Sequence, residues 1–250
     1  MKNQFHQKVV LIVQARMGSA RLPGKSMLNL SGQSLIYRVL ERIKRSDQID
    51  ELVLAIPENP QDDILVKEAE KSKVKIFRGS ENDLLDRYYK AAKSSGADIV
   101  GRIPADNPLS EPHEIDRIIS HHRSLKKPGF SSNLAQVKGN GYPDGIGAEV
   151  FDFQLLENAW MNENDRDKRE HVHLNFFDYD SDEPVDESLC PITTIECPKK
   201  YRRPDIILDV NTKQQYEFIK EIYDFFFESN PYFGIKDIID WYDNIYLKNS

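Results

Sequence analysis

The chain has 250 residues and a formal net charge of −7 at pH 7, with 39% hydrophobic and 30% charged residues. This length can bury a full core, and an α/β sheet of this size commonly forms one domain, so we predict a single domain over residues 1–250. The negative charge argues against non-specific binding to nucleic acid. Two cysteines, Cys190 and Cys197, are too few for a disulfide framework and lack the histidine pair of a zinc site.

The N-terminus, MKNQFHQK, is polar and is followed by only five consecutive apolar residues, 9–13. The sequence therefore predicts neither a signal peptide nor a membrane span. These absences favour a cytoplasmic location.

Strand and helix patterns alternate along the first half of the chain. Residues 9–13, VVLIV, are continuously apolar, as expected for a central strand that is buried on both faces. Later apolar runs predict strands at 51–56, 74–78 and 99–103. Helical spacing predicts helices at 34–46, 62–71, 84–94 and 112–122. This alternation predicts an α/β fold, with a mostly parallel sheet, helices on both faces and ligands beyond the carboxyl ends of the strands.

The second half of the chain is less regular. A glycine-rich loop covers 139–145, and an acidic, exposed excursion is expected at 178–187. The patterns predict strands at 147–150 and 206–210 and helices at 153–162 and 214–227. Apolar residues recur at helical spacing over 235–246, which indicates packing, with a dimer contact as an alternative.

The loop after the first strand combines glycine with cationic side chains. It reads QARMGSARLPGK and carries Arg16, Gly18, Arg21 and Lys25. Backbone N–H groups near Gly18 can approach phosphate oxygens closely because no Cβ intervenes, and the cations neutralise phosphate charge. The loop is neither a Walker A motif, since Ser19 stands where its first glycine is needed, nor a GxGxxG motif. It predicts a site for a small polyphosphate, with a solvated basic surface as the alternative.

A second polar group follows the strand predicted at 99–103. The sequence RIPADNPL places Asp106 just beyond the carboxyl end of that strand, near the first loop. A carboxylate there can hold Mg²⁺ against phosphates, because this hard ion prefers oxygen ligands. The alternative is an aspartate that begins a turn before Asn-Pro.

These segments together resemble the cytidylyltransferases of surface-glycan biosynthesis. The stretch IVQARMGSARLPGK is similar nearly residue for residue to the spore-coat polysaccharide F-type proteins. Residues 106–109, DNPL, resemble the Asp-x-Pro-Leu element of the related 3-deoxy-manno-octulosonate and acylneuraminate cytidylyltransferases. The resemblance implies a Rossmann-like nucleotidyltransferase fold of the GT-A kind, CTP as substrate and Mg²⁺ as cofactor. It implies catalytic roles for Arg16, Lys25 and Asp106.

The resemblance also extends to the segment that frames the nucleotide base. Arg78-Gly79-Ser80 is similar to a family element in which a donor such as Arg78 can distinguish cytosine from uracil. A helix N-cap at Asp83 and an ion pair of Arg87 are the structural alternatives. The nucleotide-binding residues implied are Ala15, Arg16, Met17, Gly18, Arg21, Lys25, Arg78, Ser80 and Asp83.

The segment IILDVNT, residues 206–212, resembles the late family strand that carries the second metal-binding acid. F-type and octulosonate members usually have Val-Asp-Thr-Pro, which places their aspartate at Asn211, whereas Asp209 matches the first acid of the Asp-x-Asp form. In a strand these two positions face the same side. The metal ligands implied are Asp106, Asp209 and Asn211, with Asp209 as our choice for the charged second ligand.

The acceptor-binding and dimerisation portion is expected at about 130–200. Arg169-Glu170-His171 resembles an F-type element in which Arg169 can bind an acidic acceptor group and Glu170 can orient His171. A structural role is the alternative for His171. The acceptor-binding residues implied are Asn133, Asp144, Glu149, Arg169 and His171.

The reaction implied joins CMP from CTP to a small anionic acceptor and releases pyrophosphate. We expect a phosphorylated acceptor, such as a sugar phosphate or a phosphoglutamine-like compound, a role in capsule or surface polysaccharide biosynthesis, and a homodimer. One alternative is a CMP-sugar-acid synthetase that acts on a 2-keto-3-deoxy sugar acid. Others are a glycosyltransferase of the same architecture and, because of Asn211, a nucleotide-binding regulatory protein without catalysis.

Overall fold

The computed structural model describes residues 6–19, 21–134 and 137–249. Its main sheet has seven strands in the order β11-β7-β8-β6-β1-β4-β5. Only β8 runs against its neighbours, so the predicted mostly parallel sheet is confirmed. The strands are β1 (Val9–Gln14), β4 (Glu51–Pro57), β5 (Lys75–Gly79), β6 (Ile99–Pro104), β7 (Phe130–Ser132), β8 (Glu149–Asp152) and β11 (Ile192–Thr193).

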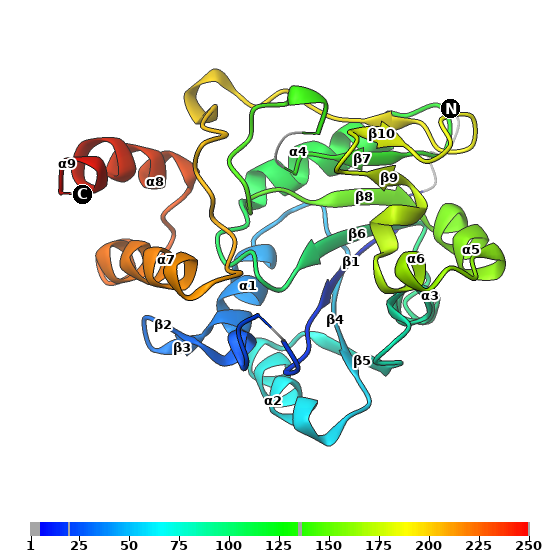
Figure 1. Cartoon of the computed structure of the whole chain (residues 1–250), viewed down its shortest axis with the longest axis horizontal. Coiled ribbons are helices and arrows are strands. Elements are labelled where there is room, and N and C mark those ends of the chain that lie inside the picture. Colours follow the sequence, from blue (N-terminus) through cyan, green and yellow to red (C-terminus); the bar gives the residue numbers. More distant parts are fainter. Residues whose placement is uncertain (1–5, 20, 135–136, 250) are drawn as a thin grey trace.

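Helices cover both faces of this sheet, and the predicted α/β fold is confirmed (Figure 1). One face carries α1 (Leu35–Ile43), α2 (Asp63–Ser72), α4 (Pro112–Arg123), α7 (Lys213–Phe226) and α8 (Ile235–Trp241). The other face carries α3 (Leu84–Ser94) and α5 (Phe153–Asn162). The short helix α6 (Arg166–Glu170) lies beside α3 and α5, and α9 (Leu247–Asn249) follows α8 at the end of the chain.

The first strand explains why the sheet has two cores. Its residues alternate between them, with Val9, Leu11 and Val13 in one cluster and Val10 and Ile12 in the other. None of these five side chains is exposed to solvent. A strand whose successive side chains point to opposite faces must be apolar throughout when both faces are covered.

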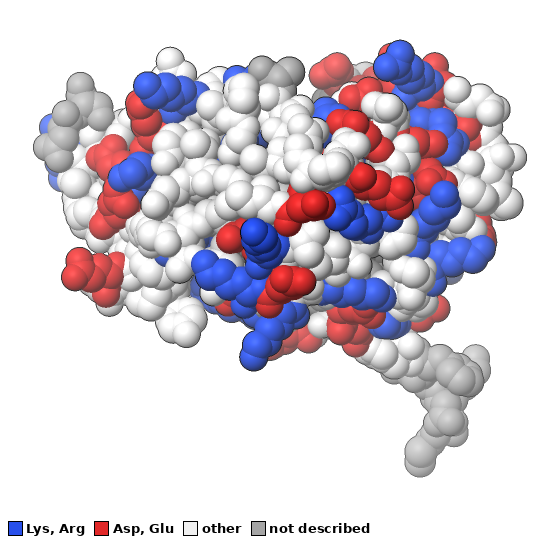
Figure 2. All heavy atoms as spheres, turned by 90° about the horizontal axis from the view of Figure 1, so that it is seen from below, with Lys and Arg blue, Asp and Glu red and all other residues white. Residues whose placement is uncertain are grey.

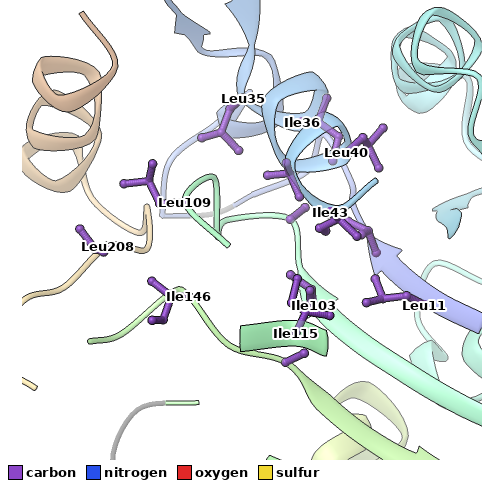
Figure 3. Close-up of a cluster of buried hydrophobic side chains, with 14 of the residues drawn as sticks. Leu11, Leu35, Ile36, Leu40, Ile43, Ile103, Leu109, Ile115, Ile146 and Leu208 are labelled. Atoms are coloured by element: carbon purple, nitrogen blue, oxygen red, sulfur yellow. The ribbon is translucent and has the colours of Figure 1, made fainter. Parts of the chain in front are cut away.

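One of the two cores lies directly behind the polar loops. Leu109, Ile146 and Leu208 are fully or almost fully buried and face one another in the cluster that continues to Ile103 and Leu11 (Figure 3). These three residues come from loops rather than from the sheet. Packing of these three apolar side chains against one another therefore fixes the positions of the loops. It also fixes the polar residues that lie next to them in the sequence.

One prediction in the second half of the chain needs correction, and the structure adds detail to two other segments. Residues 206–210 do not form a sheet strand, since Ile207 makes only an isolated bridge with Asp144. The acidic excursion contains a small hairpin, β9 (Phe177–Asp178) with β10 (Glu183–Pro184). The segment at 235–246 forms α8 (Ile235–Trp241) followed by a π-helical turn, Tyr242–Tyr246, and packs on the core as expected. The sequence also gave no signal for β7, β11 or the hairpin of β2 (Asn29–Leu30) and β3 (Gln33–Ser34).

Charged residues of both signs are interleaved on the face seen from below (Figure 2). A broad surface of one sign, as non-specific nucleic-acid binding requires, is not visible on that face. Within the described part of the chain, no helix is long and apolar enough to span a membrane.

Candidate active site

A cleft of about 300 Å³ opens where β1 and β6 end. Five cationic side chains line it, from three separate parts of the chain: Arg16, Arg21, Lys25, Arg87 and Arg102. Asp106, Glu81, Glu170 and His171 also line it. The position agrees with the rule that ligands of parallel α/β sheets bind beyond the carboxyl ends of the strands. The excess of cations suits a polyphosphate.

A buried carboxylate, that of Asp62, anchors the main chain of the cationic loop that carries Arg16, Arg21 and Lys25. Asp62 has no exposed surface, and its Oδ1 accepts a hydrogen bond of 2.7 Å from the Met17 N–H. Burial raises the pKa of Asp62 above its usual range. Farther along, Gly24 adopts φ 70°, a left-handed conformation that glycine tolerates, and turns the chain into the short 3₁₀ segment Lys25–Met27. Lys25 Nζ then donates to Asp106 Oδ2 at 2.7 Å, so the loop meets the end of β6.

Backbone hydrogen bonds bring three aspartates to one place. The Val210 N–H donates to the Asp106 carbonyl at 2.9 Å. The Asp144 N–H donates to the Ile206 carbonyl at 3.0 Å, and the Leu208 N–H donates to the Asp144 carbonyl at 3.1 Å. Asp106, Asp144 and Asp209 therefore gather beside Lys25 although residues 206–210 are not a strand.

Gly145 permits this close approach. Its φ is +83°, and a Cβ at this position would lie 2.7 Å from the carbonyl carbon of Leu208. A side chain there would push the Asp144 turn away from the segment that carries Asp209. The glycine is therefore required both for the turn and for the contact.

The gathered carboxylates repel one another. Burial, together with the charges of Asp144 and Asp106, raises the pKa of Asp209 to about 6, and Lys25 opposes this rise. Burial likewise raises the pKa of Asp144, and Asp106 adds to the effect. A cation among these carboxylates would relieve the repulsion.

The donor set fits a hard divalent cation. Asn211 Nδ2 donates to the Asp209 carboxylate, while Asn211 Oδ1 is buried and has no hydrogen-bond partner. Across the described residues, no three His, Cys, Asp or Glu side chains form a ready-made metal site. Mg²⁺ commonly takes only one or two protein carboxylates and completes its shell with water and substrate phosphate, so an open arrangement of oxygen donors is appropriate.

Two buried arginines form the inner wall of the cleft. Arg102 Nη1 donates to Glu149 Oε2 at 2.6 Å, and Glu149 Oε1 accepts from the Tyr179 hydroxyl at 2.6 Å. Burial alone would raise the pKa of Glu149, but the Arg102 guanidinium holds it below its usual range. Burial lowers the pKa of Arg87 to about 10. The Nε atoms of Arg87 and Arg102 are buried without a hydrogen-bond partner.

Breaking the Arg102–Glu149 pair should destabilise the fold strongly. We expect Glu149→Gln to lower the free energy of unfolding by about 3 to 5 kcal/mol, because it leaves a buried guanidinium without a counter-charge. Urea denaturation measures the change. Glu217→Gln is the control, since Glu217 is exposed and its ion pair with Lys213 spans 3.6 Å, and it should change stability by less than about 1 kcal/mol. Equal effects of the two variants would contradict a structural role for the buried pair.

Comparison with known proteins decides the family. The sequence model of the cytidylyltransferase family matches residues 10–238. The chain belongs to this family. The protein is therefore a nucleotidyltransferase enzyme, as the sequence resemblance implied.

Two relatives of this cytidylyltransferase match most of its length, and a third matches less than half of it. The spore coat polysaccharide biosynthesis protein SpsF of Bacillus subtilis is 32% identical over 220 residues, which is 86% of each chain. An uncharacterized protein of Methanocaldococcus jannaschii is 32% identical over 97% of this chain and 93% of its own. A 3-deoxy-manno-octulosonate cytidylyltransferase of Chloroherpeton thalassium is 36% identical over 114 residues, 45% of each chain.

Solved structures share the fold. The structure of a cytidylyltransferase from Leptospira borgpetersenii matches with a TM-score of 0.83 and 29% identity, and covers 95% of this chain and 94% of that chain. CMP:2-keto-3-deoxy-manno-octonic acid synthetase, solved with CTP, matches with a TM-score of 0.64 and 16% identity, over 87% of this chain and 99% of that chain.

The cleft of the cytidylyltransferase brings together part of the predicted nucleotide site. Ala15, Arg16, Arg21 and Lys25 line it, whereas Met17 and Gly18 belong to the same loop without lining the cleft. Arg78 lies elsewhere, because it donates to Asp63 Oδ1 at 2.6 Å and to the Asn59 carbonyl at 3.0 Å.

Ser80 and Asp83 have local structural partners. Ser80 Oγ accepts from the Asp83 N–H at 3.1 Å. Asp83 caps α3 by accepting from the Asp86 N–H at 2.9 Å, which is the N-cap considered from the sequence. Neither residue lines the cleft.

The predicted acceptor residues are divided between different environments. Asn133 is fully buried and bridges the Ala148 N–H, at 2.8 Å, and the Glu114 carbonyl, at 3.0 Å. Arg169 holds Asp83 Oδ2 with two nitrogens, at 2.8 and 2.7 Å. His171 lines the nucleotide cleft instead.

Asp144 and Glu149 line a second cavity of about 310 Å³. Arg102 lines this cavity as well as the first cleft. The remaining lining residues are Leu134, Val137, His173, Tyr179 and Asp182.

From the sequence, Arg102 has no assigned role and Arg87 is considered only as the partner of a neighbouring carboxylate, whereas Arg87 Nη1 donates to the Ser80 carbonyl at 3.0 Å. Arg102 did carry a signal, because it is the one charged residue in the otherwise apolar or small stretch at 99–105. A buried charge in a strand is unusual unless it is paired or used. The pairing with Glu149, 47 residues away, could not be predicted from local pattern.

Proposed function

We propose that this cytidylyltransferase transfers CMP from CTP to a phosphorylated small-molecule acceptor with Mg²⁺ present, in capsule or surface polysaccharide biosynthesis. The observation that supports this proposal is the cleft itself, which five cations and Asp106 line at the end of a parallel sheet, with the charges of Asp144 and Asp209 close to Asp106. Cations suit the triphosphate, and the aspartates suit the divalent ion that accompanies it.

The cationic loop would hold the triphosphate. Arg16, Arg21 and Lys25 line the outer part of the cleft and neutralise phosphate charge. Lys25 is only 13% exposed and is fixed by its ion pair with Asp106, so it requires little reorganisation as charge develops on the departing pyrophosphate. Asp106 and Asp209 would hold Mg²⁺, with Asn211 Oδ1 or Asp144 beside them. When bound, the ion would neutralise the phosphoryl oxygens and orient them.

A phosphorylated acceptor fits the inner wall. Arg87 is a buried cation that lines the cleft beyond the loop, and its Nε has no partner. Arg102 also lines the cleft, with its charge balanced by Glu149. An ionised acceptor phosphate is its own nucleophile, so no general base is needed. One of its oxygens forms a bond to the α-phosphorus of CTP as the bond from that phosphorus to the β-phosphate oxygen breaks. The products are a CDP-linked compound and pyrophosphate.

The relatives support the cellular role. The protein SpsF, similar over 86% of this chain, is named for spore coat polysaccharide biosynthesis. The octulosonate enzymes are also named as cytidylyltransferases, but the one from Chloroherpeton thalassium matches only 45% of this chain, which favours the F-type assignment over a CMP-sugar-acid synthetase.

Nucleotide choice tests the first half of the proposal. We expect CTP with Mg²⁺ to raise the melting temperature more than UTP or ATP at equal concentration, because the nucleotide that binds the folded state better stabilises it more. Thermal denaturation followed by fluorescence measures this. Stronger protection by UTP or ATP would overturn the assignment of CTP.

Pyrophosphate release tests the second half. The full chain is mixed with CTP, Mg²⁺ and single acceptors drawn from sugar phosphates, phosphoglutamine and sugar acids. Release with a phosphate monoester supports the proposal, and release with a 2-keto-3-deoxy sugar acid alone supports the synthetase alternative. CTP binding without release from any of these acceptors would overturn the proposed acceptor class.

A further inference from the structure

We propose that the second cavity receives the part of the acceptor remote from its phosphate, and that this part carries hydrogen-bond donors, hydroxyl or ammonium, and no negative charge. The inference rests on the proposed function, since it takes the acceptor phosphate to lie in the first cleft. It narrows the acceptor to a phosphate monoester without a second anionic group.

The two cavities meet at one side chain. Arg102 lines both of them, and it is 9% exposed with an Nε that has no partner. The second cavity, at about 310 Å³, has the volume of a small-ligand site. A molecule with its phosphate beside Arg87 in the first cleft can therefore extend along Arg102 into the second cavity.

The second cavity offers no free cation among the described residues that line it. Arg102 is its only arginine or lysine, and Glu149 neutralises that guanidinium at 2.6 Å. The Tyr179 hydroxyl donates to the other Glu149 oxygen, so the carboxylate is fully engaged. Arg169, the anion receptor expected from the sequence, is held by Asp83 and does not line this cavity.

The remaining polar groups of the cavity are mainly acceptors. Asp144 and Asp182 supply carboxylates. Burial lowers the pKa of His173 to about 4, so its imidazole is neutral at pH 7, and its Nδ1 is buried without a partner. A carboxylate or second phosphate would meet these groups without a compensating cation, which is costly in a partly buried site. Hydroxyl or ammonium groups would donate to them instead.

Three matched monophosphates test the inference: glucose 1-phosphate, glucosamine 1-phosphate and glucuronic acid 1-phosphate. They share the ring and the phosphate and differ in a hydroxyl, an ammonium or a carboxylate. Their affinities are measured by calorimetry on the full chain loaded with Mg²⁺ and a non-hydrolysable CTP analogue. We expect glucuronic acid 1-phosphate to bind at least 10-fold more weakly than the better of the other two. Equal or tighter binding of the acid overturns the inference, and so does a lack of binding by all three.

The relative affinities of glucose 1-phosphate and glucosamine 1-phosphate show whether the hydrogen-bond donor of the acceptor is a hydroxyl or an ammonium group. Tighter binding of glucosamine 1-phosphate identifies an ammonium group, and tighter binding of glucose 1-phosphate identifies hydroxyl groups alone. Failure of the proposed function shows separately, because the CTP analogue itself would then not bind.

A variant that removes one negative charge from the second cavity tests whether this cavity causes the weaker binding of glucuronic acid 1-phosphate. Asp182→Asn removes one lining carboxylate and suits the positive φ of 56° at this position, which asparagine tolerates. We expect it to reduce the discrimination against glucuronic acid 1-phosphate several-fold. Asp180→Asn is the matched control, since Asp180 is exposed on the same hairpin and does not line the cavity, and it should change nothing. Equal effects of the two variants would show that the cavity does not set the preference.

Discussion

Replacement of Lys25 by alanine is expected to lower turnover by about 100-fold or more, the scale observed when one preorganised electrostatic contact is removed. Lys25 Nζ lies 2.7 Å from Asp106 Oδ2 and lines the cationic cleft, so its charge is positioned before the reaction begins. The rate of pyrophosphate release with saturating CTP and acceptor measures the effect. Protection of the protein by CTP against thermal unfolding should also weaken.

The controls for this variant separate charge from folding. Lys90→Ala removes a lysine that is 54% exposed on α3 and should retain full activity. Lys25→Arg keeps a positive charge and should retain more activity than alanine. The circular dichroism spectra should coincide, because Lys25 lies in a short turn outside the apolar core. Wild-type turnover in Lys25→Ala would remove the assigned role.

Loss of either metal-site aspartate should abolish turnover. We expect Asp106→Asn and Asp209→Asn each to eliminate Mg²⁺-dependent pyrophosphate release, because each removes a formal charge from a site for a hard cation. Asn211→Asp should be tolerated and can tighten Mg²⁺ binding, since it adds a carboxylate beside Asp209. Titration of Mg²⁺ against the rate compares the three variants.

Stability without metal provides an independent readout of the same site. Asp209→Asn should raise the melting temperature of the metal-free protein, because it removes a buried charge that Asp144 and Asp106 repel. It should also remove the stabilisation that added Mg²⁺ gives. Asp205→Asn is the control, because Asp205 is exposed and pairs with Arg203 away from the other aspartates. If Asp209→Asn retains its Mg²⁺ response while Asn211→Ala loses it, the second ligand is Asn211 rather than Asp209.

The spacing of apolar residues along the sequence predicted those helices and strands in which buried residues recur at the helical or strand repeat. The helices over 84–94 and 153–162 match α3 and α5, because each has an apolar stripe at helical spacing. The run at 206–210 has the same apolar character as a strand, yet its backbone bonds go to the loops of Asp144 and Asp106. Nothing within those five residues distinguishes a loop partner from a sheet partner.

The candidate site was predictable where its residues neighbour one another in sequence. Arg16, Arg21 and Lys25 come from one loop, and they line one cleft. The partners of Arg78 and Arg169 lie 15 and 86 residues away, at Asp63 and Asp83. An arginine that is free to bind a ligand and one that is held by a distant carboxylate look the same in a sequence. Only the tertiary structure separates them.

The hydrogen bonds that gather the aspartates are all made by the main chain, with Gly145 packed against Leu208. The spacing of these acids therefore does not depend on the side chains that line the second cavity. Substitutions at Leu134, Val137 or Asp182 can then alter which acceptor is admitted while the reactive centre keeps its geometry. Because the residues that contact the acceptor are separate from those that position the aspartates, the same fold can accommodate different acceptors. The residues that line the second cavity are therefore the first positions to change in a redesign of acceptor specificity.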